Sequence, residues 1–322
     1  MTKIERLIIS SWPLTFFIEK SKRIVLPGFQ GLPLYDVSIF FFKQVKKVGL
    51  NERAAAISFN FVMAMPAAAI FLFTLVPYLP ISQQFSRELY NIVRDVTPNK
   101  DTLELVRGFL DDFFNKPKTG LLSLGFVLAL FYSSNAMMGV IRTFDKSLHE
   151  KHKSNFIQKR LRAIRLTLIV IFLLIGTILI SVGQGVLFKT VMQWLHIKRG
   201  DLRWLFKVVN WIIIVFLFLY SIGFIYKYAP SVKKRWKLLS PGAVFATSLI
   251  ILTTWVFSFW VQNFSNYNKV YGSIGTLLIL MLLVFINSLM ILIGYELNVS
   301  ITYLKSQQSF KSAKSSNSSD IK

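Results

Sequence analysis

The sequence YGSIGTLLILMLLVFINSLMILIGYELNVSITY at residues 271–303 contains one charged side chain, Glu296. A helix needs roughly 20 apolar residues to cross the hydrocarbon core of a bilayer, which is about 30 Å thick. This stretch is longer, so it predicts a membrane-spanning helix that tilts or projects beyond the bilayer. It decides the class of the protein.

Five more stretches share this apolar character, and the composition agrees with them. Of the 322 residues, 53% are hydrophobic and 16% are charged, against about 25% charged residues in an average soluble domain. The sequence therefore predicts an all-α fold: a polytopic membrane protein whose six transmembrane helices form one domain at residues 54–304. The five further spans are expected at residues 54–79, 120–141, 166–188, 208–228 and 241–262. Ser240 followed by Pro241 favours a helix start at the fifth span.

The charges predict the orientation of the chain. The net charge is +23, from 38 Lys and Arg against 15 Asp and Glu. If both termini share a side with the second and fourth loops, that side holds 26 of the basic residues and the other side holds 12. The positive-inside rule then places both termini in the cytoplasm. We expect the basic loops to face the anionic headgroups of membrane lipids, and we expect no nucleic-acid partner.

Several segments outside the spans have their own character. Residues 1–53 are basic and are expected to be cytoplasmic or interfacial, and within them residues 36–47 predict either an interfacial helix or a short helix packed under the bundle. In the first outer loop, helical spacing predicts an amphipathic helix at residues 83–96 and a second one capped by Asp101. The tail at residues 305–322 is rich in Ser and Lys and is expected to be disordered.

The sequence argues against the common kinds of catalytic site. There is no cysteine, which excludes disulfides and thiolate chemistry. His149 and His152 are three residues apart in a basic loop and do not match a zinc-protease motif, and His196 stands alone. We therefore expect no enzymatic activity, no catalytic residue, no metal and no cofactor. No apolar run near the start precedes a small-residue cleavage site, so no cleaved signal peptide is expected.

Glu296 is the one acidic residue within the apolar spans. An ionised carboxylate is costly in hydrocarbon, so it should face protein, water or a basic partner. In a functional interpretation, the carboxylate is linked to a proton or a substrate. In a structural interpretation, it anchors helix packing through a salt bridge to Arg142, Arg165 or Lys227. The sequence leaves both open.

Other polar residues in or beside the spans are candidates for either packing or function. Such side chains usually form hydrogen bonds between helices, which is the packing interpretation. In the functional interpretation, several of them line a water-filled cavity. Two tyrosines suit a membrane interface, and two glycines beside them allow close backbone approach or a break at the start of the sixth span. The candidates are Asn298, Asn60, Asn135, Gln184, Tyr267, Tyr271, Gly272, Gly275, Arg142 and Asp145.

Six blocks of the sequence resemble the YihY/virulence factor BrkB family. They are Ala54-Ala55-Ala56-Ile57-Ser58-Phe59 before Pro66, Arg142-Thr143-Phe144-Asp145-Lys146, Tyr228-Ala229-Pro230, Ser240-Pro241-Gly242-Ala243, Phe264 to Gly275, and Gly294-Tyr295-Glu296-Leu297-Asn298. The last two blocks are specific when they occur in this order. Tyr295 stands where the family block usually has alanine, which affects local packing.

The resemblance implies a six-helix protein of the bacterial inner membrane, of a kind linked to envelope integrity and serum resistance. An old family label, ribonuclease BN, has no support in this sequence. The function expected is a non-enzymatic membrane protein that transports or organises a lipid or envelope precursor. The alternative is a structural or assembly factor without transport. A membrane nuclease would need a metal cluster or an acid/base pair on the cytoplasmic side. The candidates for it are Asp145, His149, Glu150 and His152, which are a poor set.

Overall fold

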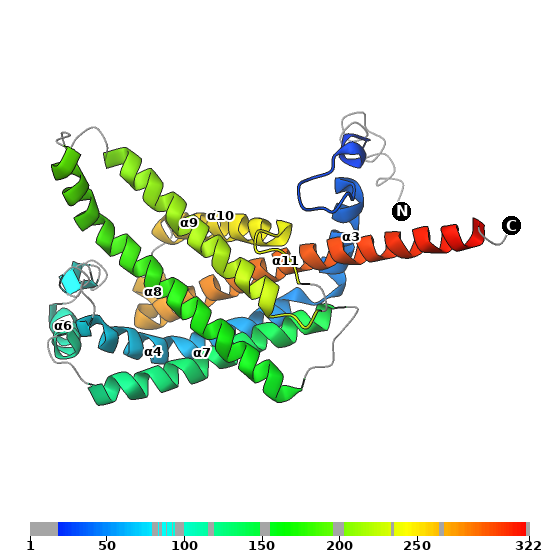
Figure 1. Cartoon of the computed structure of the whole chain (residues 1–322). Helices are drawn as coiled ribbons and strands as arrows, with labels where there is room; N and C mark the ends of the chain where they lie inside the picture. Colours follow the sequence, from blue (N-terminus) through cyan, green and yellow to red (C-terminus); the bar gives the residue numbers. More distant parts are fainter. Residues whose placement is uncertain are drawn as a thin grey trace. The chain divides into compact units, whose positions relative to one another are not determined.

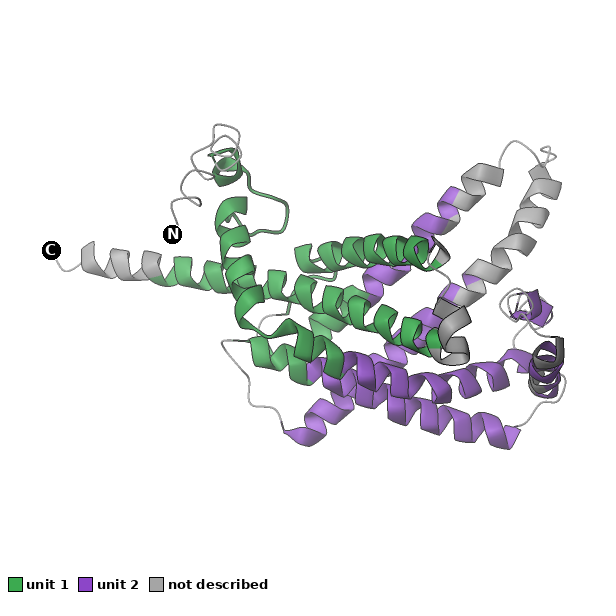
Figure 2. Cartoon of the chain, turned by 180° about the vertical axis from the view of Figure 1, so that it is seen from behind, with its two compact units in different colours: residues 1–56, 142–153, 222–322 green, residues 57–141, 154–221 purple. Residues whose placement is uncertain are grey.

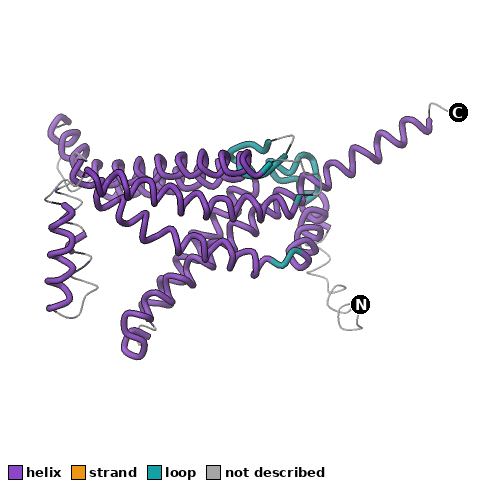
Figure 3. Tube along the Cα trace, turned by 90° about the horizontal axis from the view of Figure 1, so that it is seen from below, coloured by secondary structure: helices purple, strands orange, loops and turns teal. Residues whose placement is uncertain are grey.

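Helices make up the regular structure of the described chain (Figures 1 and 3). A computed structural model describes residues 19–78, 100–114, 119–148, 155–195, 203–232, 235–263 and 267–319, with a few residues between 83 and 93. An all-α fold is thus confirmed. In chain order the elements are α3 (Leu34–Lys47), α4 (Leu50–Leu75), the short 3-10 helix η1 (Val76–Tyr78), α6 (Lys100–Phe114), α7 (Thr119–Ser147), α8 (Phe156–Leu195), α9 (Arg203–Tyr228), α10 (Pro241–Asn263) and α11 (Tyr267–Ser319).

Five segments of the described residues are long and apolar enough to cross a membrane, which confirms a polytopic membrane fold. The sixth expected span, residues 166–188, lies within α8, where most side chains beyond residue 177 are outside the described part. The count of six therefore stays a prediction. The five segments are Leu50–Tyr78, Thr119–Ser147, Trp211–Tyr228, Pro241–Val261 and Leu277–Phe310.

Local signals in the sequence locate several helix ends. The hydroxyl of Ser240 accepts a hydrogen bond from the Ala243 N–H at 3.3 Å, and α10 begins at Pro241 as expected. Asp101 differs from the expectation: α6 already begins at Lys100, so Asp101 lies within the helix and not before it. The amphipathic helix expected at residues 83–96 lies mostly outside the described residues.

Helix α11 is continuous over its whole length. It runs without a break from Tyr267 through Gly272 and Gly275 to Ser319, so residues 305–319 of the expected disordered tail are helical. No Gly or Pro follows Gly294 to stop the helix. Polar contacts one turn apart also support its end, among them a 2.8 Å hydrogen bond from the Gln307 amide to the hydroxyl of Tyr303.

The chain divides into two compact units, coloured separately in Figure 2. Unit 1 contains residues 1–56, 142–153 and 222–322, and unit 2 contains residues 57–141 and 154–221. Helices α4, α7 and α9 each contribute one end to unit 1 and the rest to unit 2.

In unit 1, α3 packs against α11 and α10 packs along α11. Val37 and Phe41 of α3 are buried in a cluster with Leu297 and Ile301 of α11, which fits a helix packed under the bundle. Ile39 and Phe42 on the same helix are exposed. They leave an apolar face for an interface, so α3 has features of both expected interpretations.

In unit 2, the parts of α4 and α7 lie against each other at small residues. The rings of Phe71 and Phe126 are 5.4 Å apart, and a Cβ at Gly125 would meet the backbone of Phe71 at 3.4 Å. A Cβ at Gly139 would lie 3.3 Å from the amide nitrogen of Asn60. Small residues thus allow this close packing of two membrane helices, as is usual in bilayers.

Candidate functional site

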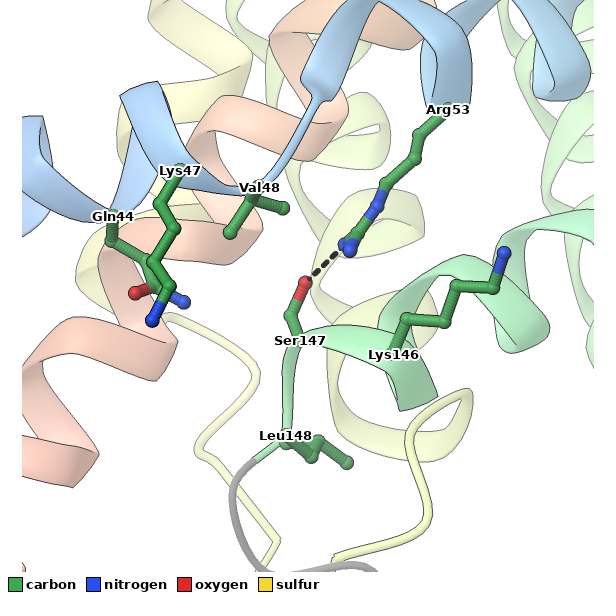
Figure 4. A pocket seen from close by; sticks show the side chains of 7 residues that line it. All are labelled: Gln44, Lys47, Val48, Arg53, Lys146, Ser147 and Leu148. Carbon is green, nitrogen blue, oxygen red and sulfur yellow. Dashed lines mark hydrogen bonds between the residues drawn. The ribbon is translucent and has the colours of Figure 1, made fainter.

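Glu296 lies in unit 1 with its side chain fully buried. Its Oε1 atom accepts a hydrogen bond from the hydroxyl of Ser147 at the end of α7. The same hydroxyl accepts a hydrogen bond from Nη1 of Arg53, at 2.7 Å, near the start of α4 (Figure 4). Nη1 of Arg53 is 4.0 Å from Oε1 of Glu296. Ser147 therefore bridges a carboxylate and a guanidinium from two other helices.

The pairing leaves Glu296 incompletely satisfied. Its Oε2 atom is buried and accepts no hydrogen bond of ordinary geometry from the described residues, although the amide of Gln44 also interacts with the carboxylate. Buried polar atoms nearly always have a partner, because leaving one unpaired costs about 1–3 kcal/mol.

Arg53 corrects the expected partner of Glu296, which was Arg142, Arg165 or Lys227. Arg142 is exposed, whereas the side chain of Arg53 is only 19% exposed and faces the carboxylate. Sequence reasoning assigned Arg53 to the basic N-terminal segment and missed it. Its position directly before the apolar stretch at residue 54 was the available signal, because a cation there can extend along the helix to a buried acid.

Aromatic side chains surround the backbone that carries Glu296. The ring of Tyr295 stacks on Phe144 with centroids 3.7 Å apart and planes 5° apart, and its hydroxyl donates to the Phe144 carbonyl at 3.2 Å. Tyr226 meets both rings edge to face, and its hydroxyl donates to the Ile291 carbonyl at 2.5 Å. The larger residue in place of the usual alanine thus fills the interior of unit 1.

Asn298 connects α11 to the start of α10. Its Oδ1 atom accepts the Gly242 N–H at 2.8 Å, and its Nδ2 atom donates to the hydroxyl of Ser240 at 2.8 Å. Gly242 also lies so close to Gly294 that a Cβ on Gly294 would be 2.5 Å from the Gly242 carbonyl oxygen. Asn298 therefore has a packing role: it accepts one N–H group of the helix start and holds the hydroxyl of the capping Ser240.

Asp145 also has structural partners. Its Oδ1 atom accepts the backbone N–H of Ser231 at 2.9 Å, and its Oδ2 atom accepts the Ser231 hydroxyl at 3.2 Å. Ser231 follows Pro230 in the segment after α9. The carboxylate thus connects the end of α7 to that segment within unit 1.

A pocket of about 260 Å³ lies beside Arg53 and Ser147 (Figure 4). Three of its lining side chains are cations, and none is an acid. Two of them, Lys47 and Lys146, are exposed to solvent. Glu296 does not line the pocket itself, but its carboxylate accepts a hydrogen bond from Ser147, which does. Such a pocket suits the recognition of an anion. Its lining residues are Gln44, Lys47, Val48, Arg53, Lys146, Ser147 and Leu148.

Two of the remaining candidates, Asn60 and Asn135, belong to unit 2. In unit 2, Asn60 faces Gly139, and the Oδ1 atom of Asn135 accepts a hydrogen bond from Arg160 at 2.5 Å. Arg160 also lies over the ring of Phe131, 5.3 Å from its centroid. Both asparagines thus have neighbours within unit 2, as expected of packing groups. Gly275 of α11 is buried, and the other candidates on helices have side chains outside the described part: Gln184, Tyr267, Tyr271 and Gly272.

Metal binding has no candidate in the described residues, which contain no cluster of three or more His, Cys, Asp or Glu side chains. His149, His152 and His196 lie outside them. What the described site offers chemically is a buried acid, a bridging hydroxyl and a group of cations.

The family profile described as Virulence factor BrkB matches residues 41–319. The chain belongs to this family. A putative ribonuclease-like protein, YfkH, from Bacillus subtilis is 28% identical over 248 residues, which cover 77% of this chain and 88% of that protein. A UPF0761 membrane protein, NTHI0384, from Haemophilus influenzae is 21% identical, over 83% of this chain and 95% of its own. No solved structure matches the chain.

The structure brings together three of the sequence blocks that resemble the BrkB family. Residues 142–146, 240–243 and 294–298 all lie in unit 1. Phe144 of the first block stacks on Tyr295 of the third, and Ser240 of the second is hydrogen-bonded to Asn298 of the third. In this BrkB-family chain, separate motifs therefore form one polar and aromatic cluster that positions Glu296.

Proposed function

We propose that this BrkB-family protein is a non-enzymatic protein of the bacterial cytoplasmic membrane, with both termini in the cytoplasm. In this proposal it transports or organises a lipid or envelope precursor that carries an anionic group. The observation that carries the proposal is the position of Arg53, which contacts the buried network of Glu296 and also lines the basic pocket.

The chemistry of this arrangement follows from competition for one cation. The anionic group of the precursor binds between Lys47, Lys146 and Arg53. Because Arg53 and Glu296 are 4.0 Å apart, beyond ordinary hydrogen-bond distance, the guanidinium can turn to a stronger bidentate partner such as a phosphate. Glu296 then keeps its bond to Ser147 and its interaction with the Gln44 amide. Occupation of the pocket thereby changes the charge balance between three helices, which a transporter or organiser of anionic lipids can use.

The pocket lies at the cytoplasmic side in this proposal. Lys146 and Arg53 adjoin the most basic side of the chain, which holds both termini and the second and fourth loops. The positive-inside rule assigns that side to the cytoplasm. The anionic precursor therefore enters from the inner leaflet, or from the cytoplasm itself.

Tight packing in unit 1 favours the second candidate, an assembly factor without transport. The close approach of Gly242 and Gly294 and the stacked rings of Phe144 and Tyr295 are typical of a rigid scaffold. In that case, Glu296 serves only to hold α4, α7 and α11 together. A nuclease is not favoured: the name of YfkH says that it is ribonuclease-like, but the described residues of this chain offer no metal-binding cluster.

The test is native mass spectrometry of the gently extracted protein, combined with lipidomics of the co-purified molecules. We expect an anionic lipid or precursor enriched over the bulk membrane, and we expect Glu296→Gln and Arg53→Gln to lose it while the protein stays folded. Glu52→Gln is the matched control, because Glu52 is exposed and adjoins Arg53. Bulk lipid alone, together with a reproducible protein partner, would support the assembly factor instead. Loss of Glu296→Gln protein from the membrane would indicate a packing role.

A further inference from the structure

A second cavity in unit 1, of about 710 Å³, shares no residue with the pocket beside Arg53. Its walls come from the segment before α3, the segment between α9 and α10, the first residues of α10 and the middle of α11. The lining residues are Leu26, Gly28, Gln30, Gly31, Arg235, Trp236, Lys237, Leu239, Ser240, Pro241, Asn298, Ile301 and Thr302.

The polar part of this lining is cationic. Arg235 and Lys237 are both exposed, and none of the lining residues is acidic. The guanidinium of Arg235 lies over the ring of Tyr228, 5.1 Å from its centroid, which limits the positions it can take. Two cations separated by one residue can bind the oxygens of a single phosphate from two sides.

Trp236, between the two cations, is held in place. Its indole N–H donates to the hydroxyl of Thr302 at 2.9 Å, and its ring meets Tyr295 edge to face at 5.3 Å. The neighbouring wall is apolar: Leu239 is 51% exposed and Leu26 is 39% exposed. The cavity thus has a cationic part next to a hydrocarbon surface that is open to contact.

The wall before α3 is built by its backbone. Gly28 has a φ of +87°, and a Cβ there would lie 2.6 Å from Cγ of Pro241. Glycine is therefore required both for the turn and for the close approach to α10. The next turn is fixed by hydrogen bonds between backbone groups, including Leu34 N–H to the Ile24 carbonyl at 2.9 Å. The cavity is therefore preformed.

The position of the cavity along the chain places it at a membrane surface. Arg235, Trp236 and Lys237 connect two apolar segments, Trp211–Tyr228 and Pro241–Val261, each long enough to span a bilayer. The segment between two spans must lie at one face of the membrane, where lipid headgroups are. Tryptophan and basic side chains are also enriched at that level.

We propose that this cavity is a binding site for a net-anionic phosphate-bearing amphiphile, one whose headgroup carries no positive charge to offset the phosphate. The phosphate lies between Arg235 and Lys237, and the apolar part of the ligand packs on Trp236, Leu239 and Leu26. The site is separate from the pocket beside Arg53, so this inference does not rest on the function proposed above, and either one can fail alone.

The test uses the fluorescence of Trp236 in the full-length protein, reconstituted in phosphatidylcholine vesicles. The chain has seven tryptophans, so the contribution of Trp236 is the difference between the wild type and Trp236→Phe. We expect phosphatidylglycerol with brominated chains to quench that contribution several-fold more than brominated phosphatidylcholine at the same mole fraction. The double variant Arg235→Gln/Lys237→Gln should lose this preference.

The matched control is Lys43→Gln/Lys46→Gln, which removes two exposed cations of unit 1 that line neither cavity. It should keep the preference. Equal quenching by the two brominated lipids in the wild type would overturn the proposal, and so would an equal loss in the control. Added inorganic phosphate distinguishes the source of the ligand. Relief of quenching shows a site that also takes free phosphate, and persistent quenching shows a site for the whole lipid.

Discussion

Replacement of Gly294 by alanine tests the packing of α10 on α11. The added Cβ would lie 2.5 Å from the Gly242 carbonyl oxygen, 2.6 Å from the Cβ of Ala246 and 2.8 Å from the hydroxyl oxygen of Tyr226. Two of these atoms belong to α10 and cannot be moved by a change of rotamer. The helices must therefore separate to accept one methyl group.

The expected size of the effect follows from two opposing terms. Overpacking of a well-packed interior costs about 1–3 kcal/mol, and alanine gains roughly 1 kcal/mol over glycine in a helix. Because a backbone carbonyl resists displacement, the upper part of the first range applies. We expect Gly294→Ala to lower the free energy of unfolding by about 1–2 kcal/mol.

The assay is unfolding in mixed micelles of mild detergent and dodecyl sulfate, followed by helical circular dichroism. The control is Gly176→Ala in α8, because a Cβ there would meet nothing within 4 Å, so its stability should be unchanged or slightly higher. Combining Gly294→Ala with Ala246→Gly removes one of the three contacts and should restore part of the loss, as a coupling energy between neighbours. If Gly294→Ala were as stable as Gly176→Ala, the close approach of the two helices would be wrong.

Three further predictions follow from single polar contacts. Ser147→Ala removes the hydroxyl that donates to Glu296 and should lower the free energy of unfolding by about 1–3 kcal/mol, since the carboxylate loses a buried donor. Asn298→Ala breaks two hydrogen bonds to the start of α10 and should lower it by a similar amount, about 1–3 kcal/mol. Burial, and then a hydrogen bond to Asp111, raises the pKa of Tyr90 from 10.0 to about 12, so an ultraviolet pH titration of wild type minus Tyr90→Phe should show one tyrosine ionising near pH 12.

The Ser147 prediction has a matched control, and the Tyr90 prediction has an outcome that would contradict it. Ser221→Ala removes a hydroxyl that donates to the Leu217 carbonyl one turn back in its own helix, so its stability should change much less than that of Ser147→Ala. A difference titration centred near pH 10 would contradict the environment of Tyr90. The sign for stability also follows: the contribution of Tyr90 is complete below pH 10 and is lost as the pH rises toward 12.

Features decided by neighbouring residues could be predicted from the sequence. The apolar length of residues 271–303 predicted a membrane helix, and Ser240-Pro241 predicted the start of α10. These signals depend on hydrophobicity and local backbone geometry, which a single sequence contains. The helical tail to Ser319 was missed because its Ser- and Lys-rich composition suggested disorder, although it contains no helix breaker.

Contacts between distant segments could not be predicted in the same way. Glu296 was recognised as a costly buried acid, but its partner was expected among other cations, because proximity in space between α4 and α11 leaves no mark in one sequence. Ser147 was missed for a similar reason: a serine just after an expected span, at the start of a basic loop, is ordinary until the fold places it between Arg53 and Glu296.

The structural and functional interpretations of Glu296 need not exclude each other. A carboxylate that served packing alone would be expected to hold its cation in a close bidentate pair, because a buried charge is costly unless it is fully matched. Here the cation is 4.0 Å away and shares a serine hydroxyl with the acid. The same cation also lines a pocket without acids. In the proposed function, the network therefore connects three helices while Arg53 also serves as the cation that binds the anionic group.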